Sequence, residues 1–150
     1  MIRPLRADDK AAFLSLVHTF YQTPAVAKPV PDSHHLRTFE RIMRGDPFCS
    51  AYMIVYHGQS VGYGLVGITY SNEAGGLVVW LDELFILPEY RSLGLGKEFF
   101  AYLESHAPQD TAWIRLEIEP DNKRAEALYR KLGYERMPYA PMKKQLRTDK

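Results

Sequence analysis

The sequence contains a single cysteine, Cys49, so no disulfide can form within the chain. It also lacks an apolar run near the ~18 or more residues that a membrane-spanning helix needs. The start of the chain shows no charged-then-apolar leader. Together these absences predict a cytoplasmic protein that has no membrane partner.

Neither sign of charge is in excess, because 19 Lys and Arg residues oppose 18 Asp and Glu residues. Proteins that bind nucleic acid through its phosphates usually carry a basic excess, so we expect no nucleic-acid partner. The histidines form no metal-ligand pattern, since His34 and His35 are adjacent and no H-x-x-x-H pair occurs. We therefore expect no metal site.

The composition is that of a globular domain. The chain has 150 residues, of which 46% are hydrophobic and 25% are charged. A domain of this length buries roughly 68–70% of the surface that its unfolded chain exposes. No internal repeat, linker or low-complexity segment divides the sequence, so we expect one domain over residues 1–150.

The spacing of apolar residues predicts both helices and strands. Helical spacing predicts helices at about 9–21, 33–44, 93–106 and 122–132. Segments rich in Val, Ile and Tyr predict strands at about 1–5, 50–56, 60–70, 77–87, 111–118 and within 134–146. The resulting order, β-α-α-β-β-β-α-β-α-β-β, lacks strict βαβ alternation. It indicates an α/β fold with a mixed sheet and helices on both faces.

A literal G-x-G-x-x-G pattern at residues 62–67 suggests a dinucleotide loop, but its surroundings contradict that function. Such a loop needs a helix after it, whereas Ile68, Thr69 and Tyr70 continue a strand. No lysine or His-Arg-Asp signature follows to support a kinase. We interpret these glycines as small residues where a strand bends or a neighbour packs closely.

A second glycine-rich segment follows the strand predicted at 77–87, which Pro88 must end. It contains Arg91, Gly94 and Gly96 at the first turn of an amphipathic helix. Glycines let backbone N–H groups approach a ligand, a helix N-terminus attracts anions, and an arginine can bind phosphate oxygens. The spacing favours a pyrophosphate site, with a glycine-containing helix start and a surface arginine as the alternative.

Two motifs resemble one known family. Arg91-x-x-Gly94-x-Gly96 matches the acyl-CoA-binding motif, Arg/Gln-x-x-Gly-x-Gly/Ala, of the GCN5-related N-acetyltransferases, the GNAT family. The preceding residues 84–89 look like the fourth strand of that family. A second block is similar to the family's later asparagine, helix, tyrosine and Gly-Phe/Tyr ending: Asn122-x-x-Ala125-x-x-Leu128-Tyr129-x-x-x-Gly133-Tyr134. The two motifs cover about residues 77–137.

The resemblance implies a single-domain GNAT-like fold whose fourth and fifth strands splay apart, with acetyl-CoA as cosubstrate. In this family the backbone amides of the glycine-rich segment bind the pyrophosphate, and the exposed edge of the fourth strand pairs with pantetheine. The asparagine holds the pantetheine arm or the chain near it. The implied coenzyme-binding residues are Phe85, Ile86, Leu87, Arg91, Ser92, Leu93, Gly94, Leu95, Gly96, Lys97, Asn122 and Tyr129.

The resemblance also implies catalytic residues. Tyr129 matches the family tyrosine that protonates the departing thiolate, and the alternative for Tyr129 is a half-buried helix aromatic. A carboxylate, acting directly or through water, would take the proton of the amine. Asp82 and Glu83 are consecutive on one strand and are expected to face opposite sides, while Glu117 is expected on the fifth strand. All three carboxylates stay candidates for the general base, and Asp82 has the shortest side chain.

The sequence thus predicts an acetyl-CoA-dependent N-acetyltransferase, in which a primary amine of a small molecule or peptide attacks the thioester directly. The alternatives are a coenzyme A-binding regulatory module without turnover and a plain interaction domain. In this fold the first two helices and the loop between them select the acceptor, and residues 23–33 carry no motif that names it. The sequence leaves a homodimer open.

Overall fold

The computed structural model describes residues 1–147. The chain forms two compact units, of which the first is Met1–Leu116 and the second begins at Glu117. That both units form one domain stays a prediction. Within the described residues, every helix is too short or too polar to cross a bilayer.

The first unit is built on a five-stranded sheet in the order β1-β2-β3-β4-β5. Neighbouring strands are antiparallel except β4 and β5, which are parallel. The elements are β1 (Ile2–Pro4), α1 (Lys10–Tyr21), α2 (Asp32–Met43), β2 (Cys49–Tyr56), β3 (Gln59–Ser71), β4 (Gly76–Ile86), α3 (Leu95–His106) and β5 (Thr111–Leu116). Short 3-10 turns occupy Ala7–Asp9 and Pro88–Tyr90. The mixed sheet predicted from the sequence is confirmed.

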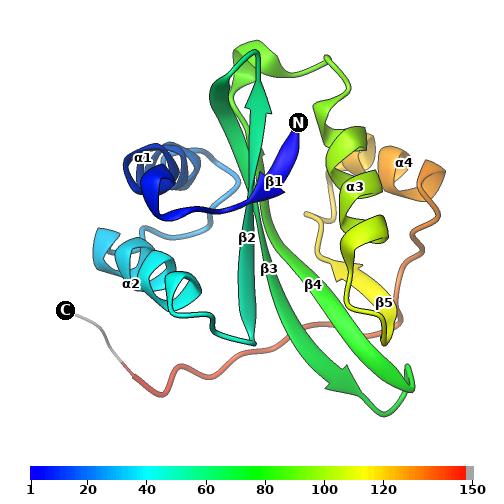
Figure 1. Cartoon of the computed structure of the whole chain (residues 1–150). Helices are drawn as coiled ribbons and strands as arrows, with labels where there is room; N and C mark the ends of the chain where they lie inside the picture. Colours follow the sequence, from blue (N-terminus) through cyan, green and yellow to red (C-terminus); the bar gives the residue numbers. More distant parts are fainter. Residues whose placement is uncertain (148–150) are drawn as a thin grey trace. The chain divides into compact units, whose positions relative to one another are not determined.

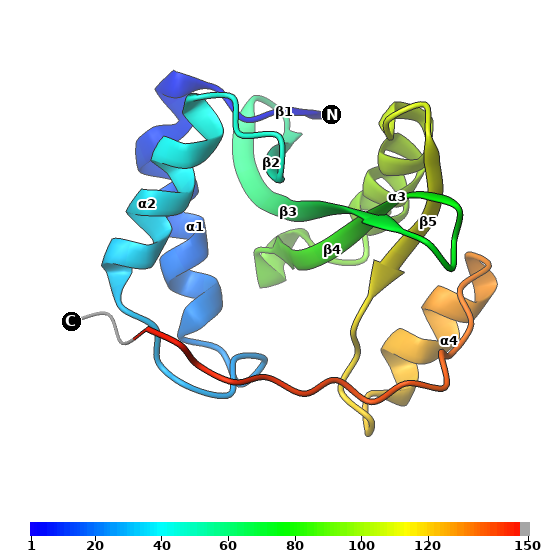
Figure 2. The same ribbon diagram turned by 90° about the horizontal axis from the view of Figure 1, so that it is seen from below.

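Helices cover both faces of this sheet, because alternate residues of β3 contact different helices. The ring centroids of Tyr63 on β3 and Phe13 on α1 are 5.5 Å apart. The next residue, Gly64, faces α3, since a Cβ built on it would lie 2.2 Å from the ring of Phe99. Helices α1 and α2 therefore lie on one face and α3 on the other (Figures 1 and 2).

The three glycines of the G-x-G-x-x-G pattern lie inside β3, and two of them, Gly62 and Gly64, are packing residues. Besides the contact of Gly64 with Phe99, a Cβ on Gly62 would lie 2.4 Å from the carbonyl oxygen of Phe85. Neither position has room for a side chain, so the interpretation as close packing is confirmed.

The sheet opens where β4 leaves β5. Their last paired residues are Leu81 and Leu116, whereas β4 continues to Ile86 on β3 alone. Asp82 is an extra residue at this point, because β3 pairs with Leu81 and with Glu83 but not with Asp82. The predicted splay of the fourth and fifth strands thus begins at a β-bulge.

The second unit contains α4 (Lys123–Lys131), which begins at its N-cap Asn122. Gly133, with φ of +94°, follows its end. The strands expected within 134–146 are absent from the described part of this unit, and Pro138 and Pro141 there cannot donate to a ladder. The prediction of a strand to residue 118 is also wrong, since Glu117 follows the end of β5 and is exposed.

Candidate active site

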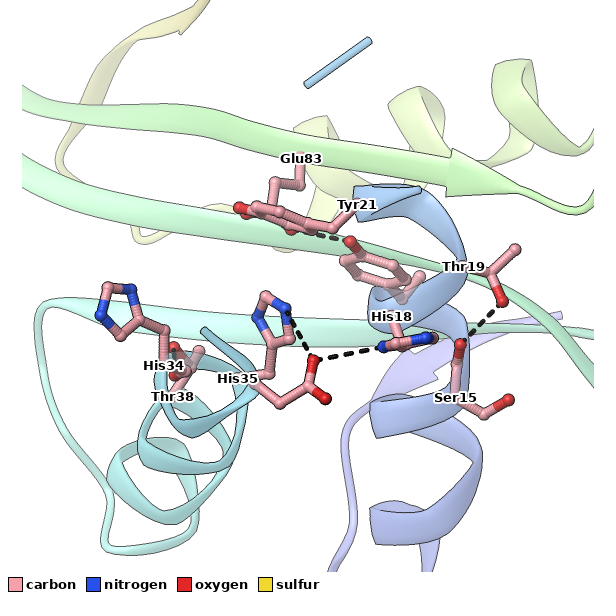
Figure 3. A network of polar contacts seen from close by, with 10 residues as sticks. Ser15, His18, Thr19, Tyr21, His34, His35, Thr38 and Glu83 are labelled. Carbon is pink, nitrogen blue, oxygen red and sulfur yellow. Dashed lines mark hydrogen bonds and ion pairs between the residues drawn. The ribbon is translucent and has the colours of Figure 1, made fainter. Parts of the chain in front are cut away.

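Glu83 on β4 is held by two tyrosines from other elements. The hydroxyl of Tyr21, the last residue of α1, donates to Glu83 Oε2 at 2.6 Å. The hydroxyl of Tyr63 on β3 donates to Oε1 at 2.7 Å. Burial and the charge of Glu83 raise the pKa of both tyrosines, so each phenol stays protonated at neutral pH. The carboxylate is therefore fixed in position, and its other lone pairs can bind a ligand. Figure 3 shows Glu83 beside Tyr21.

Glu83 lines a pocket of about 240 Å³ beside α1 and α2. Its wall combines apolar and polar side chains, and among residues 1–147 no lysine or arginine contributes to it. Glu83 lies two residues after Leu81, the last residue of β4 that pairs with β5, so the pocket lies beside the opening of the sheet. The lining residues are Phe13, Val17, Tyr21, Val30, His34, His35, Thr38, Leu65 and Glu83.

The other two candidate carboxylates differ from Glu83. Glu117 is exposed and belongs to the second unit. Asp82 is exposed on the bulge, and its Oδ2 lies 3.6 Å from a Cβ built on Gly67. Gly67 and Tyr63 lie on the same side of β3. Because Asp82 lies beside Gly67 and Glu83 accepts a hydrogen bond from Tyr63, the two carboxylates lie on one face of the sheet. The expectation that they face opposite sides is wrong, because the bulge shifts the alternation.

The segment before α3 has the geometry of an anion site. Ser92 and Gly94 both adopt positive φ, of 67° and 80°, and no described side chain caps the helix N-terminus. A Cβ built on Gly96 would meet nothing within 4 Å, so the first turn borders open space. Backbone N–H groups in such a turn attract phosphate oxygens. This segment therefore fits the pyrophosphate of coenzyme A.

Arg91 is positioned against the free end of β4. Its Nε donates to the carbonyl oxygen of Ile86 at 2.9 Å, and its guanidinium carbon lies 5.8 Å from the ring centroid of Phe85. The guanidinium forms no ion pair with any residue in the range 1–147, and Arg91 is exposed. Arg91 can thus bind a phosphate while it stays tied to the strand.

The other candidate coenzyme-binding residues of the first unit differ in their exposure to solvent. Phe85 and Leu95 are buried core residues, so only their backbone groups can contact a ligand. Ile86 and Leu87 are half-buried, while Leu93 and Lys97 are exposed. The structure thus brings the strand end and the glycine-rich segment together as the sequence predicts.

In the second unit, Asn122 accepts a hydrogen bond through Oδ1 from the backbone of Ala125 at 3.1 Å and so caps α4. Tyr129 is half-buried, and its ring lies 6.0 Å from that of Tyr134. Burial raises the pKa of Tyr129, which keeps its phenol protonated at neutral pH. The coenzyme and acid roles of these residues stay predictions.

Sequence reasoning missed Tyr21 and Tyr63, which donate hydrogen bonds to Glu83, and His35, which lines the pocket beside Glu83. The only signal for the two tyrosines was Glu83 itself, because a carboxylate in an apolar strand needs hydrogen-bond partners. Tyr21 lies 62 positions from Glu83 along the chain. The sequence therefore indicates that partners exist but does not identify them.

A model of the acetyltransferase (GNAT) family matches residues 13–134. The chain belongs to the GNAT acetyltransferase family. One curated relative is the thialysine N-epsilon-acetyltransferase of Mus musculus, 30% identical over 115 residues that cover 67% of each chain. Another is the aminoglycoside N(6')-acetyltransferase type 1 of Salmonella typhimurium, 25% identical over 109 residues that cover 70% of this chain and 74% of the relative.

The fold of this GNAT chain also matches solved structures. The structure of AAC(6')-Iy in complex with the bisubstrate analogue CoA-S-monomethyl-acetylneamine superposes with a TM-score of 0.79. The match covers 97% of each chain at 20% sequence identity. At this identity the likeness supports the shared fold and not a shared acceptor.

Proposed function

We propose that this GNAT protein transfers an acetyl group from acetyl-CoA to a primary amine of a small molecule or peptide bound in the pocket at Glu83. The observation that carries this proposal is the carboxylate of Glu83, fixed by two phenols where β4 diverges from β5. The curated relatives act on amines according to their names, which agrees with an amine acceptor.

The pocket chemistry suits an ammonium group. A primary amine has a pKa near ~10 and enters mostly protonated, and Glu83 gives it a charge-assisted partner. Glu83 accepts a proton from the amine, directly or through water, and the freed lone pair attacks the thioester carbonyl. A C–N bond forms as the C–S bond breaks, and in our proposal Tyr129 donates its proton to the departing sulfur.

The segment from Arg91 to Lys97 would hold the coenzyme. Its uncapped helix start, the open space at Gly96 and the positioned guanidinium of Arg91 support phosphate binding. Coenzyme A bound there supplies the activated acetyl group. The cytoplasmic location and a homodimer stay predictions.

A thermal-shift titration and an acetyl-transfer screen together test this function. Saturating acetyl-CoA should raise the Tm, because a ligand that binds only the folded state stabilises it. The screen should cover polyamines, aminoglycosides, amino acids and short peptides. Binding without transfer to any amine would favour a coenzyme A-binding regulatory module, and absence of binding would favour an interaction domain.

A further inference from the structure

A second pocket adjoins the pocket that contains Glu83. It has a volume of about 460 Å³ and is formed by residues of α1 and α2. His35 lines both pockets, so the two cavities share this residue as a wall. The residues around the second pocket are Leu14, Ser15, His18, Asp32, Ser33, His35 and Leu36.

Among residues 1–147, each of the two pockets is lined by one carboxylate and by no lysine or arginine. In the first pocket the carboxylate is Glu83, and in the second pocket it is Asp32. Two adjacent cavities of negative charge favour a ligand with two positive charges over a ligand with one.

Asp32 has capacity to bind a cation. Its Oδ1 lies 3.2 Å from Nδ1 of His18 and 4.0 Å from Nε2 of His35. Its Oδ2 makes no hydrogen bond or ion pair with any residue in the range 1–147, and the side chain is 75% exposed. A ligand can therefore reach this carboxylate without displacing a protein partner.

His35 supplies an independent sign of a ligand. Its side chain is only 8% exposed, and its Nε2 is buried without a hydrogen bond to any described residue. Burial lowers the pKa of His35, although the nearby charges of Glu83 and Asp32 oppose this effect. The imidazole is thus neutral at pH 7, and Nε2 can accept a hydrogen bond from a donor placed beside Asp32.

The same imidazole connects the two pockets. The ring centroids of His35 and Tyr21 are 4.6 Å apart, and Tyr21 donates its hydroxyl hydrogen to Glu83 (Figure 3). A ligand that spans both cavities would therefore pass along His35 and Tyr21.

We propose that the pocket at Asp32 is a second acceptor subsite, so that the preferred acceptor is a compact molecule with two ammonium groups. The reacting ammonium binds at Glu83, and the distal ammonium binds between Asp32 and His35 Nε2. This inference rests on the proposed acetyl transfer at Glu83.

Asp32 has a structural alternative, because it lies in the first turn of α2, where a negative charge stabilises the helix. In that case the loss of its charge would change stability and leave the choice of amine unaltered. The experiment must therefore compare two amines on one variant.

The experiment measures KM and kcat for 1,4-diaminobutane and for butylamine, which have the same carbon chain and differ in the distal charge. For Asp32→Asn we expect KM for the diamine to rise about tenfold, with kcat and the KM for butylamine nearly unchanged. Asp32→Glu should restore most of the diamine affinity. Glu40→Gln is the matched control, since Glu40 is exposed on α2 outside both pockets.

The outcomes separate this inference from the proposed function. Equal KM values for the two amines, or an equal effect of Asp32→Asn on both, would overturn the second subsite while acetyl transfer stands. If neither amine is acetylated, calorimetric titration of the same variants with 1,4-diaminobutane still tests the subsite. Binding that Asp32→Asn does not weaken would then overturn it.

Discussion

At the scale of single residues, the site depends on how the protein holds one carboxylate. Glu83 would be costly in an apolar strand without hydrogen bonds, and the phenols of Tyr21 and Tyr63 provide them. Tyr63 is fully buried, so its hydroxyl cannot turn away to water. The carboxylate therefore stays pre-positioned before an acceptor binds.

The proposed acid role of Tyr129 gives the first prediction. Tyr129→Phe removes one hydroxyl and keeps the ring packing against Tyr134, so acetyl-CoA affinity should change little. Loss of a positioned proton donor should lower kcat about 10²–10⁴-fold. Steady-state kinetics on an acceptor from the screen measure this effect. A variant that keeps more than about half of the kcat would make Tyr129 a packing residue and water the proton donor.

At the scale of secondary-structure elements, the first turn of α3 should tolerate a side chain at Gly96, but that side chain should prevent the binding of acetyl-CoA. Because nothing lies within 4 Å of a Cβ on Gly96, Gly96→Glu should fold normally. Its carboxylate would occupy the space of the phosphates and repel them, so acetyl-CoA binding should be abolished. Calorimetric titration measures this loss. Ser105→Glu adds the same charge near the other end of α3 and should bind as the unmodified protein does.

An unchanged affinity for acetyl-CoA in Gly96→Glu would place the phosphate site elsewhere. A loss of affinity that Ser105→Glu shares would instead indicate a general effect of charge on α3.

A partly buried ion pair fixes β1 to the start of α1 and predicts a pH dependence of stability. The guanidinium of Arg3 donates to both oxygens of Asp9, at 2.7 and 2.8 Å. These hydrogen bonds lower the pKa of Asp9 in the folded state. The stabilisation is therefore complete above the unfolded pKa of about 3.9 and is lost as the pH falls through the folded value.

Asp9→Asn should destabilise the protein by about 1–3 kcal/mol at pH 7, because it leaves a mostly buried guanidinium without its charged partner. The difference in the free energy of unfolding between the two proteins should shrink as the pH falls below about 4, because Asp9 then takes up a proton in the unfolded chain before it does so in the folded protein. Urea denaturation at pH 7 and at pH 3 checks this. A difference that does not change with pH would show that Asp9 contributes through its shape and not its charge.

Elements with a strong local signal could be predicted from the sequence. The turn between β2 and β3 is an example, since His57 and Gly58 adopt φ of 48° and 78°, as a tight hairpin turn requires. The prediction of strands within 134–146 is wrong, because Pro138 and Pro141 interrupt the apolar pattern of this segment. The position of Asp82 could not be predicted either, since a β-bulge depends on how two strands pair and not on the composition of one.

At the scale of the whole molecule, the family motifs fall on both compact units. The glycine-rich segment and Glu83 belong to the first unit, and Asn122 and Tyr129 belong to the second. The sequence predicted a phosphate-binding segment at 91–97 because the signal for such a segment is local, and its binding of coenzyme A stays a prediction. It could not choose among the three candidate carboxylates, because the hydrogen bonds that distinguish Glu83 come from Tyr21 and Tyr63, which are distant from it in sequence.

The most direct test of the account is the kinetics of Glu83→Gln with an acceptor from the screen. The amide keeps the shape of Glu83 but cannot accept the proton of the amine or pair with its charge, so kcat/KM for the acceptor should fall at least about 100-fold. The Kd for acetyl-CoA should stay the same. Glu104→Gln, an exposed position on α3, is the matched control and should retain full activity. A Glu83→Gln protein that transfers acetyl groups within about twofold of the unmodified rate would contradict the assignment of this pocket as the active site.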